Sequence, residues 1–304
     1  MLARYTIEEN SIKQIDSETA PIQVYVNPDD AEKQRLISNY KLDEHTLNSA
    51  LDPEELSRME FEPDHLAVIL NRPKNYSGHD KLLFKVASMG LFLFKNRLIV
   101  VISEDIPLFT GKKFRRVAEV NDVFLKLIYN SIYHYVEHLK IINMITDEIE
   151  KKLSESMENK YLLNLFTLEK SLVYYYNAIN SNGFVFSKMR NSSEKIGFSI
   201  EETEMLDDII IENGQCLKQA EIYSNILASM MDARSSLVSN NLNQLMKTLN
   251  LITIGIMVPT LVVSAFSMNV TIPFQKHHHA FWIIMGFAVI SVLVTYRYWR
   301  YKKW

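Results

Sequence analysis

The chain has 304 residues, a formal net charge of −3 and 47% hydrophobic residues. These averages exclude an intrinsically disordered chain and a strongly basic nucleic-acid-binding protein. The single cysteine, Cys216, excludes an intrachain disulfide framework and a zinc site built from a cysteine cluster. Only 8 glycines are present, and no glycine-rich phosphate or dinucleotide motif occurs. The first ten residues lack an apolar core, so we expect no signal peptide.

Residues 1–118 are expected to form a cytosolic α+β domain. Acidic helix starts predict helices over Asp29–Tyr40 and Asp52–Met59. Several runs are rich in β-branched and aromatic residues, and turn residues at 71–73 and 95–97 mark where such runs end. These runs predict five strands, at 22–26, 65–70, 82–86, 90–94 and 97–102.

Residues 119–200 are expected to form long cytosolic helices, because apolar residues recur every three or four positions from Val120. Asn182-Gly183 is expected to break this pattern. A second long helix is predicted to start near Ser199, where Ser199 and Glu202 have the spacing of a capping box. It continues over 201–266, and at about 1.5 Å per residue it would be about 100 Å long. A globular domain needs no such length, so we predict a stalk that enters a membrane.

Two C-terminal segments, 248–275 and 277–296, contain no Asp, Glu, Lys or Arg. Each includes an apolar run close to the length that spans a bilayer, although two buried helices of a soluble core would also be apolar. The aromatic and basic residues that follow favour the cytosolic side, which places both termini inside a multi-pass protein of the cell membrane. The predicted segments are a first transmembrane helix over about 246–266, a loop at 267–279, a second transmembrane helix at 280–298 and a basic cytosolic end at 299–304.

A polar stripe follows the predicted stalk and first transmembrane helix. Positions alternately four and three residues apart hold no Leu, Ile, Val or Phe: Asn225, Ser229, Asp232, Ser236, Ser239, Asn243, Met246, Asn250, Thr253, Met257, Thr260, Ser264 and Ser267. Such residues can join helices through hydrogen bonds. Alternatively, they line an aqueous path for hard, hydrated cations, with Met246 and Met257 as apolar constrictions. One chain supplies one such helix, so a path requires a homo-oligomer.

The segment from Asp232 to Leu249, Pro259 and the sequence Ser267-Met268-Asn269, followed by a short loop, a second apolar segment and a basic end, resembles the CorA family of magnesium transporters. The resemblance implies a funnel-shaped homopentameric channel for a divalent cation, with Mg²⁺ the first expectation. It implies a selectivity loop of Ser267, Met268 and Asn269, and a regulatory Mg²⁺ at Asp232 through which cytosolic Mg²⁺ gates the channel. The stripe and the family positions together give the expected pore lining: Asn243, Met246, Leu249, Asn250, Thr253, Met257, Thr260 and Ser264.

The loop departs from the family pattern. The family has glycine where this chain has Ser267, and the loop contains no acidic residue but does contain Lys276, which would repel cations. His277, His278 and His279 could bind Zn²⁺, Co²⁺ or Ni²⁺. Two alternatives therefore stay open: a Zn²⁺, Co²⁺ or Ni²⁺ transporter of the same family, and a non-transporting membrane-anchored scaffold or sensor.

An enzyme is not expected, because no nucleophile–base constellation is evident. His134 and His138 lie four residues apart and could bind a metal with Glu137, but a packed or solvated helix face is the favoured interpretation. The carboxylate pairs Asp29-Asp30 and Asp207-Asp208 are interpreted as helix-start or surface acids. The expected partners are other copies of the chain, the lipid bilayer and divalent cations, and no nucleic acid.

Overall fold

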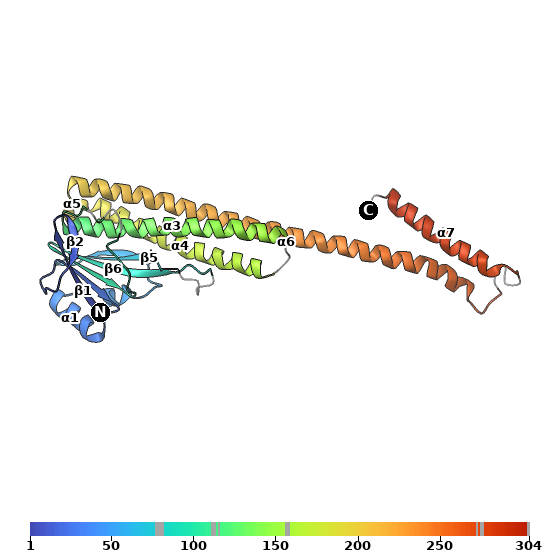
Figure 1. Ribbon diagram of the computed structural model, residues 1–304, viewed down its shortest axis with the longest axis horizontal. Helices are drawn as coiled ribbons and strands as arrows, with labels where there is room; N and C mark the ends of the chain where they lie inside the picture. Colours follow the sequence, from blue (N-terminus) through green and yellow to red (C-terminus); the bar gives the residue numbers. More distant parts are fainter. Residues whose placement is uncertain are drawn as a thin grey trace. The chain divides into compact units, whose positions relative to one another are not determined.

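The computed structural model describes residues 1–76, 82–110, 114, 116–155, 159–271, 273 and 277–302. The chain divides into two compact units, Met1–Met231 and Asp232–Trp304. The boundary lies inside helix α6 (Ile200–Phe266), which contributes to both units (Figure 1).

A seven-stranded sheet forms the centre of the first unit, with strand order β2-β1-β3-β7-β6-β5-β4 (Figure 1). The strands are β1 (Leu2–Glu8), β2 (Ser11–Gln14), β3 (Ile22–Val26), β4 (Arg58–Phe61), β5 (Leu66–Pro73), β6 (Val86–Phe94) and β7 (Arg97–Ile102). Strands β3 and β7 pair in parallel, and the other neighbouring pairs are antiparallel.

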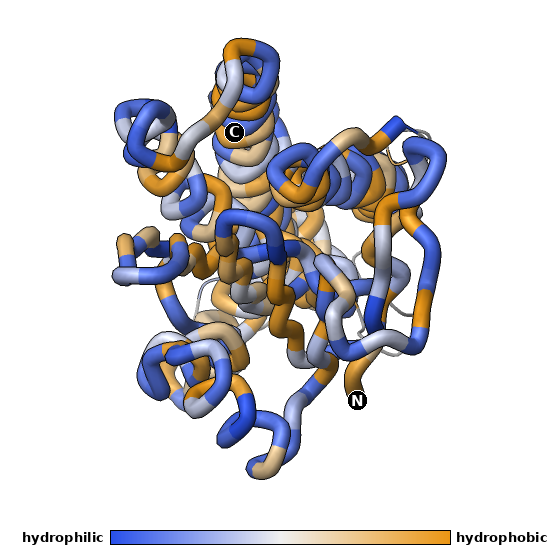
Figure 2. The backbone as a smooth tube through the Cα atoms, turned by 90° about the vertical axis from the view of Figure 1, so that its left-hand side faces the viewer, coloured by the Kyte–Doolittle hydropathy of each residue, from blue (hydrophilic) through white to orange (hydrophobic). Residues whose placement is uncertain are grey.

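Helices cover both faces of this sheet. Leu98, Val100 and Ile102 of β7 share one core with the helices α3 (Val120–Glu155) and α4 (Asn159–Asn191). The alternate residues Ile99 and Val101 share the other core with α1 (Asp30–Tyr40) and α2 (Glu44–Ser49). Successive side chains point to opposite faces of a strand, so a strand covered on both sides is apolar throughout. In Figure 2, which looks onto this unit, the peripheral turns are mostly hydrophilic.

Four of the five predicted strands correspond to β3, β5, β6 and β7, and the helix predicted from Asp29 corresponds to α1. Asp29 and Glu32 form the full capping box, in which each side chain accepts the backbone N–H of the other residue, at 2.8 and 3.2 Å. The strand predicted at 82–86 is wrong, because β6 begins at Val86. The turn predicted at 71–73 is also wrong, because β5 runs to Pro73. Strands β1, β2 and β4 were not predicted.

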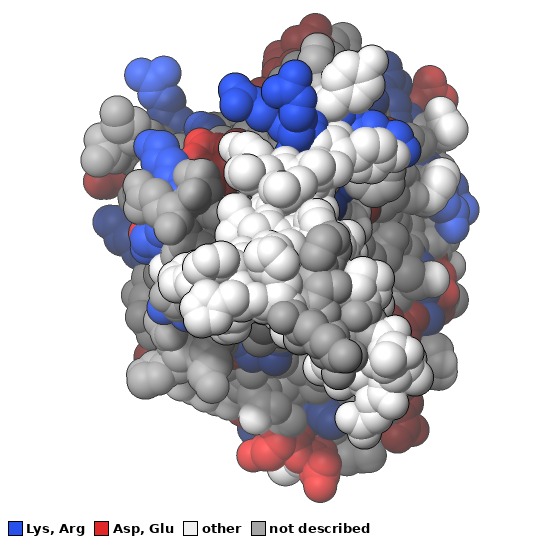
Figure 3. All heavy atoms as spheres, turned by 90° about the vertical axis from the view of Figure 1, so that its right-hand side faces the viewer, with Lys and Arg blue, Asp and Glu red and all other residues white. Residues whose placement is uncertain are grey.

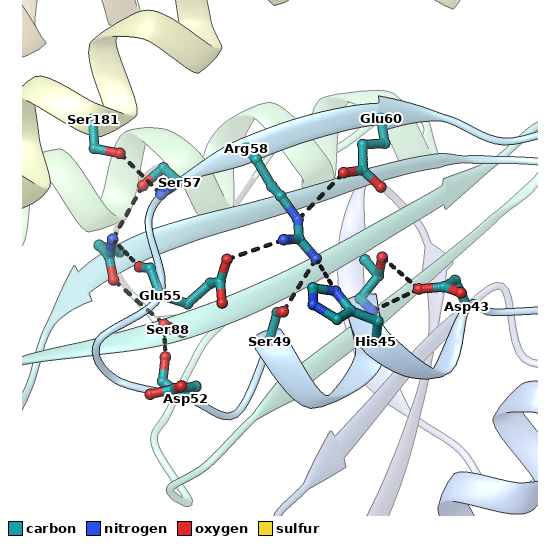
Figure 4. A network of polar contacts seen from close by, with 12 residues as sticks. Asp43, His45, Ser49, Asp52, Glu55, Ser57, Arg58, Glu60, Ser88 and Ser181 are labelled. Carbon is teal, nitrogen blue, oxygen red and sulfur yellow. Dashed lines mark hydrogen bonds and ion pairs between the residues drawn. The ribbon is translucent and has the colours of Figure 1, made fainter.

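The helix predicted over Asp52–Met59 is wrong as well, because polar groups of this segment bond to other elements (Figure 4). The Ser57 N–H donates to Ser181 Oγ of α4 at 2.9 Å, and Asn71 Nδ2 of β5 donates to the Glu55 carbonyl at 3.0 Å. The Arg58 guanidinium contacts Glu55, Glu60, His45 and Ser49 at 3.0–3.4 Å. The network holds α2 and the segment before β4 against the sheet and α4.

The helix break predicted at Asn182-Gly183 is wrong, because α4 continues to Asn191. A Cβ at Gly183 would lie 3.0 Å from Nδ2 of Asn213 on α6, so the glycine permits close packing of two helices. The chain turns instead after α5 (Ser193–Ile196), where Gly197 has a φ of 88°. The predicted capping box at the start of α6 is confirmed, with Glu202 N–H to Ser199 Oγ at 3.1 Å and Ser199 N–H to Glu202 Oε2 at 2.7 Å.

The second unit contains the C-terminal part of α6 and helix α7 (Ala280–Tyr301). Both α6 and α7 include a stretch long and apolar enough to cross a membrane. Near the connecting loop the rings of Phe266 and Phe287 stack, with centroids 6.1 Å apart. Viewed toward the loop end, the hairpin presents uncharged side chains (white in Figure 3). Helix α7 extends beyond residue 298, so the aromatic and basic residues up to Tyr301 belong to the helix.

Candidate ion pathway

The polar stripe lies on one face of α6 in the second unit. At about 100° per residue, its members between Asn250 and Ser264 fall within a sector roughly 80° wide. They are all exposed within a single chain: Asn250, Thr253, Met257, Thr260 and Ser264. Among the described residues of the second unit, none covers this face.

The opposite face of α6 carries the residues that are partly covered. The half-buried residues of this stretch are Leu251, Val258, Pro259, Val262 and Phe266. Their mean direction lies roughly 180° from that of the stripe. Helix α7 of the same chain thus packs on the apolar side of α6 and leaves the polar side open.

Hydroxyl groups on the stripe donate hydrogen bonds to backbone carbonyls of their own helix. Ser236 Oγ donates to the Asp232 carbonyl at 3.0 Å, Thr253 Oγ1 to Leu249 at 2.9 Å, and Thr260 Oγ1 to Ile256 at 2.6 Å. A hydroxyl that donates in this way keeps oxygen lone pairs for another donor. This face therefore offers acceptor oxygens, which suit the water shell of a hydrated cation.

Ser267 ends α6 and begins the loop. Its N–H and its Oγ both donate to the Ser264 carbonyl, at 3.1 and 2.9 Å, which pairs one of the carbonyls left open at a helix end. Ser267 is not among the described non-glycine residues with positive φ. Serine therefore adopts this backbone conformation without strain, although the family carries glycine here. Met268 and Asn269 follow and are exposed, while Lys276 lies outside the described residues.

Asp232 is the last acidic residue of the chain, because the sequence from residue 233 to 304 contains no Asp or Glu. Its side chain is exposed on α6. Within the described part of one chain, no group of three or more His, Cys, Asp or Glu side chains could hold a metal ion. A metal site at Asp232 therefore needs ligands from another copy, water molecules, or both.

The loop histidines are close in sequence but do not converge. The ring centroids of His277 and His279 are 6.1 Å apart, those of His278 and His279 are 5.0 Å apart, and all three side chains are exposed. The His279 N–H approaches Nδ1 of His277 at 3.3 Å. A metal bound here would also need water molecules, side chains from another copy, or both.

The other candidate metal pair lies on α3 in the first unit, where His138 is buried and His134 is half-buried. The two rings are 4.3 Å apart, and His138 Nδ1 is 2.5 Å from the Tyr175 hydroxyl oxygen. Burial and the neighbouring His134 lower the pKa of His138 to about 4. Burial lowers the pKa of His134 as well, with a further contribution from Arg72. Both imidazoles are therefore neutral at pH 7, and the packed-face interpretation accounts for them.

The carboxylate pairs have structural partners too. Asp29 caps α1, and Asp207 Oδ1 accepts from Arg190 Nε at 2.6 Å. The face of α6 that packs on α7 cannot be assigned from the sequence, because apolar residues surround the stripe on both sides. A cue was available, since Val258, Val262 and Phe266 repeat every four residues opposite the stripe.

A sheet-and-helix unit that continues through one long helix into an apolar hairpin is typical of a membrane protein with a large domain outside the bilayer. The family model described as CorA-like Mg²⁺ transporter protein matches residues 24–300. The chain therefore belongs to this family.

Known proteins agree with this assignment. The chain is 25% identical over 298 residues to the cobalt/magnesium transport protein CorA of Methanocaldococcus jannaschii, covering 91% of this chain and 89% of the relative. The complete structure of the CorA magnesium transporter from that organism matches with a TM-score of 0.86 at 20% identity, over 99% of this chain and 97% of that one. The full-length CmaX protein matches with a TM-score of 0.74 at 14% identity, over 99% and 97% of the two chains.

Proposed function

We propose that five copies of the chain form a channel in the cell membrane that passes hydrated divalent cations, Mg²⁺ first among them. The polar stripe of α6 faces the shared axis, and α7 lies outside α6. Both termini lie in the cytosol. The pore lining comprises Asn243, Met246, Leu249, Asn250, Thr253, Met257, Thr260 and Ser264, and the loop Ser267-Met268-Asn269 forms the outer mouth.

One observation carries the proposal. Within a single chain α7 covers the apolar face of α6, whereas Asn250, Thr253 and Thr260 stay exposed. Polar groups that face hydrocarbon are unfavourable, so this face requires water or polar groups from another copy. Five stripes around an axis supply water and polar groups together. The edges of each stripe contact the stripes of neighbouring copies, and its centre faces a water-filled path.

Neutral oxygens suit the proposed cargo. Mg²⁺ loses its water shell reluctantly, and the stripe can accept hydrogen bonds from that shell without stripping it. No carboxylate follows Asp232 in the sequence, so binding along the membrane part of the path is weak enough for release. An inward-negative potential drives entry with about 2.3 kcal/mol per charge per 100 mV, and a divalent ion gains twice that.

Asp232 is proposed to act in regulation. It is the only carboxylate in the membrane-proximal part of the stripe, and five copies around an axis would repel one another. Mg²⁺ bound between copies from the cytosolic side would neutralise that repulsion and hold the bundle closed. Falling cytosolic Mg²⁺ would then open the channel.

Two matched asparagines test the pathway. Asn243 lies on the stripe, whereas Asn241 lies on the same turn of α6, roughly 160° away. In proteoliposomes loaded with a Mg²⁺ indicator, we expect Asn243→Leu to reduce Mg²⁺ influx about tenfold or more, because five leucines would close the path by dewetting. Asn241→Leu should retain most of the influx. Equal effects of the two variants, or no influx of any divalent ion into wild-type vesicles, would refute the proposal.

The loop determines which ion passes, and a metal panel tests it. Influx of Mg²⁺, Co²⁺, Ni²⁺ and Zn²⁺ is compared for wild type, Asn269→Ala and an alanine triple at His277, His278 and His279. We expect Mg²⁺ influx to fall in Asn269→Ala and to persist in the triple variant. Dominant Zn²⁺ influx that falls in the triple variant would make Zn²⁺ the cargo instead.

A further inference from the structure

A groove lies between the two membrane helices of the second unit. Its volume is about 460 Å³, and its walls are almost entirely hydrocarbon. The residues that define it are Leu251, Ile254 and Gly255 on α6, Val292 and Trp299 on α7, and Lys302 directly after α7. The ion pathway does not use this feature, because these α6 positions lie off the polar stripe.

Gly255 leaves the groove open. A Cβ placed at this residue would meet no atom within 4 Å. Val292, Thr295 and Trp299 on α7 and Lys302 directly after it follow one another at spacings of three and four residues, which places them on one face of the helix. The groove therefore follows one face of α7, and its apolar walls suit a hydrocarbon chain.

One end of the groove is aromatic and basic. Trp299 and Lys302 line it, and Arg297 and Arg300 are exposed on the same two turns of α7. The sequence after Asp232 contains no acidic residue, so this end of the unit carries only positive side-chain charge. Aromatic rings and basic side chains at this depth suit the headgroup region of a bilayer, and basic pockets between membrane helices bind anionic headgroups.

We infer that the groove binds an anionic phospholipid, with one acyl chain between α6 and α7 and the headgroup phosphate beside Lys302, the basic residue that lines the groove. The inference rests on the membrane insertion of the proposed function but not on the transported ion. A lipid fits better than a second copy of the chain. The groove opens on the side of α6 away from the stripe, which faces the bilayer when the stripe faces the axis.

Trp299 provides a direct probe. The chain has three tryptophans, so Trp282→Phe with Trp304→Phe leaves Trp299 as the sole reporter in the full-length protein. The protein is placed in phosphatidylcholine vesicles that contain a small fraction of brominated lipid, which quenches tryptophan on contact. At equal bromine content, we expect brominated phosphatidylglycerol to quench Trp299 at least twofold more than brominated phosphatidylcholine.

Two sets of variants separate the acyl and headgroup contributions. Gly255→Leu fills the groove and should remove the preference for phosphatidylglycerol. Gly286→Leu is the matched control, because Gly286 is also a helix glycine with no atom within 4 Å of a Cβ but does not line the groove. Lys302→Gln removes the charge that lines the groove without filling it and should also abolish the preference.

Three outcomes would overturn the inference. Equal quenching by both lipids would mean contact with bulk bilayer only. No quenching by either lipid would mean that protein, such as a second copy, fills the groove. An unchanged preference in Gly255→Leu would place the lipid elsewhere. Mg²⁺ influx measured in the same vesicles is a separate readout, so failure of the ion pathway and failure of the lipid site are distinguishable.

Discussion

His138 should make the first unit sensitive to acid. Its side chain is 5% exposed, the Phe84 ring contacts it edge-on at 5.3 Å, and the Tyr175 hydroxyl and the His134 ring also contact it. Burial and the neighbouring His134 lower its pKa from 6.5 to about 4. The unfolded chain therefore binds a proton at this residue between about pH 6.5 and 4, while the folded chain does not. The contribution of His138 to the free energy of unfolding is therefore fully present above pH 6.5 and is lost as the pH falls toward 4.

The size of this effect follows from the pKa difference. Each pKa unit corresponds to about 1.4 kcal/mol, so the full drop is equivalent to roughly 3 kcal/mol of unfolding free energy. For a unit of this size, that would lower the melting temperature by about 10 °C. Thermal unfolding of the full-length protein in detergent, followed by circular dichroism at pH 7.0 and 4.5, measures the loss. Carboxylates contribute equally to the pH-dependent loss of stability in wild type and in a His138→Gln variant. The difference between the two losses therefore measures the contribution of His138.

His138→Gln replaces the imidazole with an amide that does not titrate but can still bond to Tyr175. We expect the variant to lose less stability than wild type between the two pH values, by most of the 3 kcal/mol calculated above. The reasoning is refuted if the two proteins lose the same amount.

Three further predictions follow from the described contacts. A Cβ at Gly90 would lie 2.6 Å from Ala50 Cβ, so Gly90→Ala should cost about 2 kcal/mol in an unfolding measurement, and Ala50→Gly should restore part of it; additive losses would contradict the clash. Burial, with a smaller contribution from Glu212, raises the pKa of Cys216 to about 12, so at pH 8 a thiol reagent should react at least about a hundredfold more slowly than in urea; equal rates would show an accessible thiol. Met257→Ser should raise Mg²⁺ influx several-fold, because it replaces an apolar constriction with a hydroxyl; unchanged influx would remove Met257 from the gate.

Much of the fold could be predicted from the sequence because several elements carry strong local signals. The central strands β3, β5 and β7 are buried on both faces and are therefore nearly continuous apolar runs. The capping boxes of α1 and α6 are complete within four residues each. Signals of this kind need no information from distant parts of the chain.

The errors arose where distant contacts decide the structure. Asp52–Met59 has an acidic, helix-like start, but its polar groups are bound by residues from β5 and α4, more than ten residues away in sequence. Gly183 reads as a breaker, yet its missing side chain makes room for Asn213 of another helix. Edge strand β2 has two exposed residues among its four, which weakens the apolar pattern on which strand prediction depends.

The stripe could be found from the sequence because its spacing matches the helical repeat. Whether it joins helices or lines a path could not be decided in that way. The face of α6 that α7 leaves uncovered is a property of packing between segments separated by a loop, and the pore-lining role of the stripe stays a prediction. The sequence also shows that no acidic residue follows Asp232. That one end of the groove is positively charged could not be predicted, because it depends on which basic residue lines the groove.

Helix α6 also contains Pro259, and this residue has a mechanical consequence. Proline has no N–H, so the carbonyl of Gly255, four residues earlier, loses its helical donor. Bending α6 between these two residues therefore breaks one hydrogen bond fewer than bending it elsewhere, and Gly255 adds no side chain to resist the motion. Helix α6, which runs from the first unit to the loop before α7, thus has a built-in hinge within its apolar stretch. Motion about this hinge would change the width of the space beside Gly255 and the position of Met257 together.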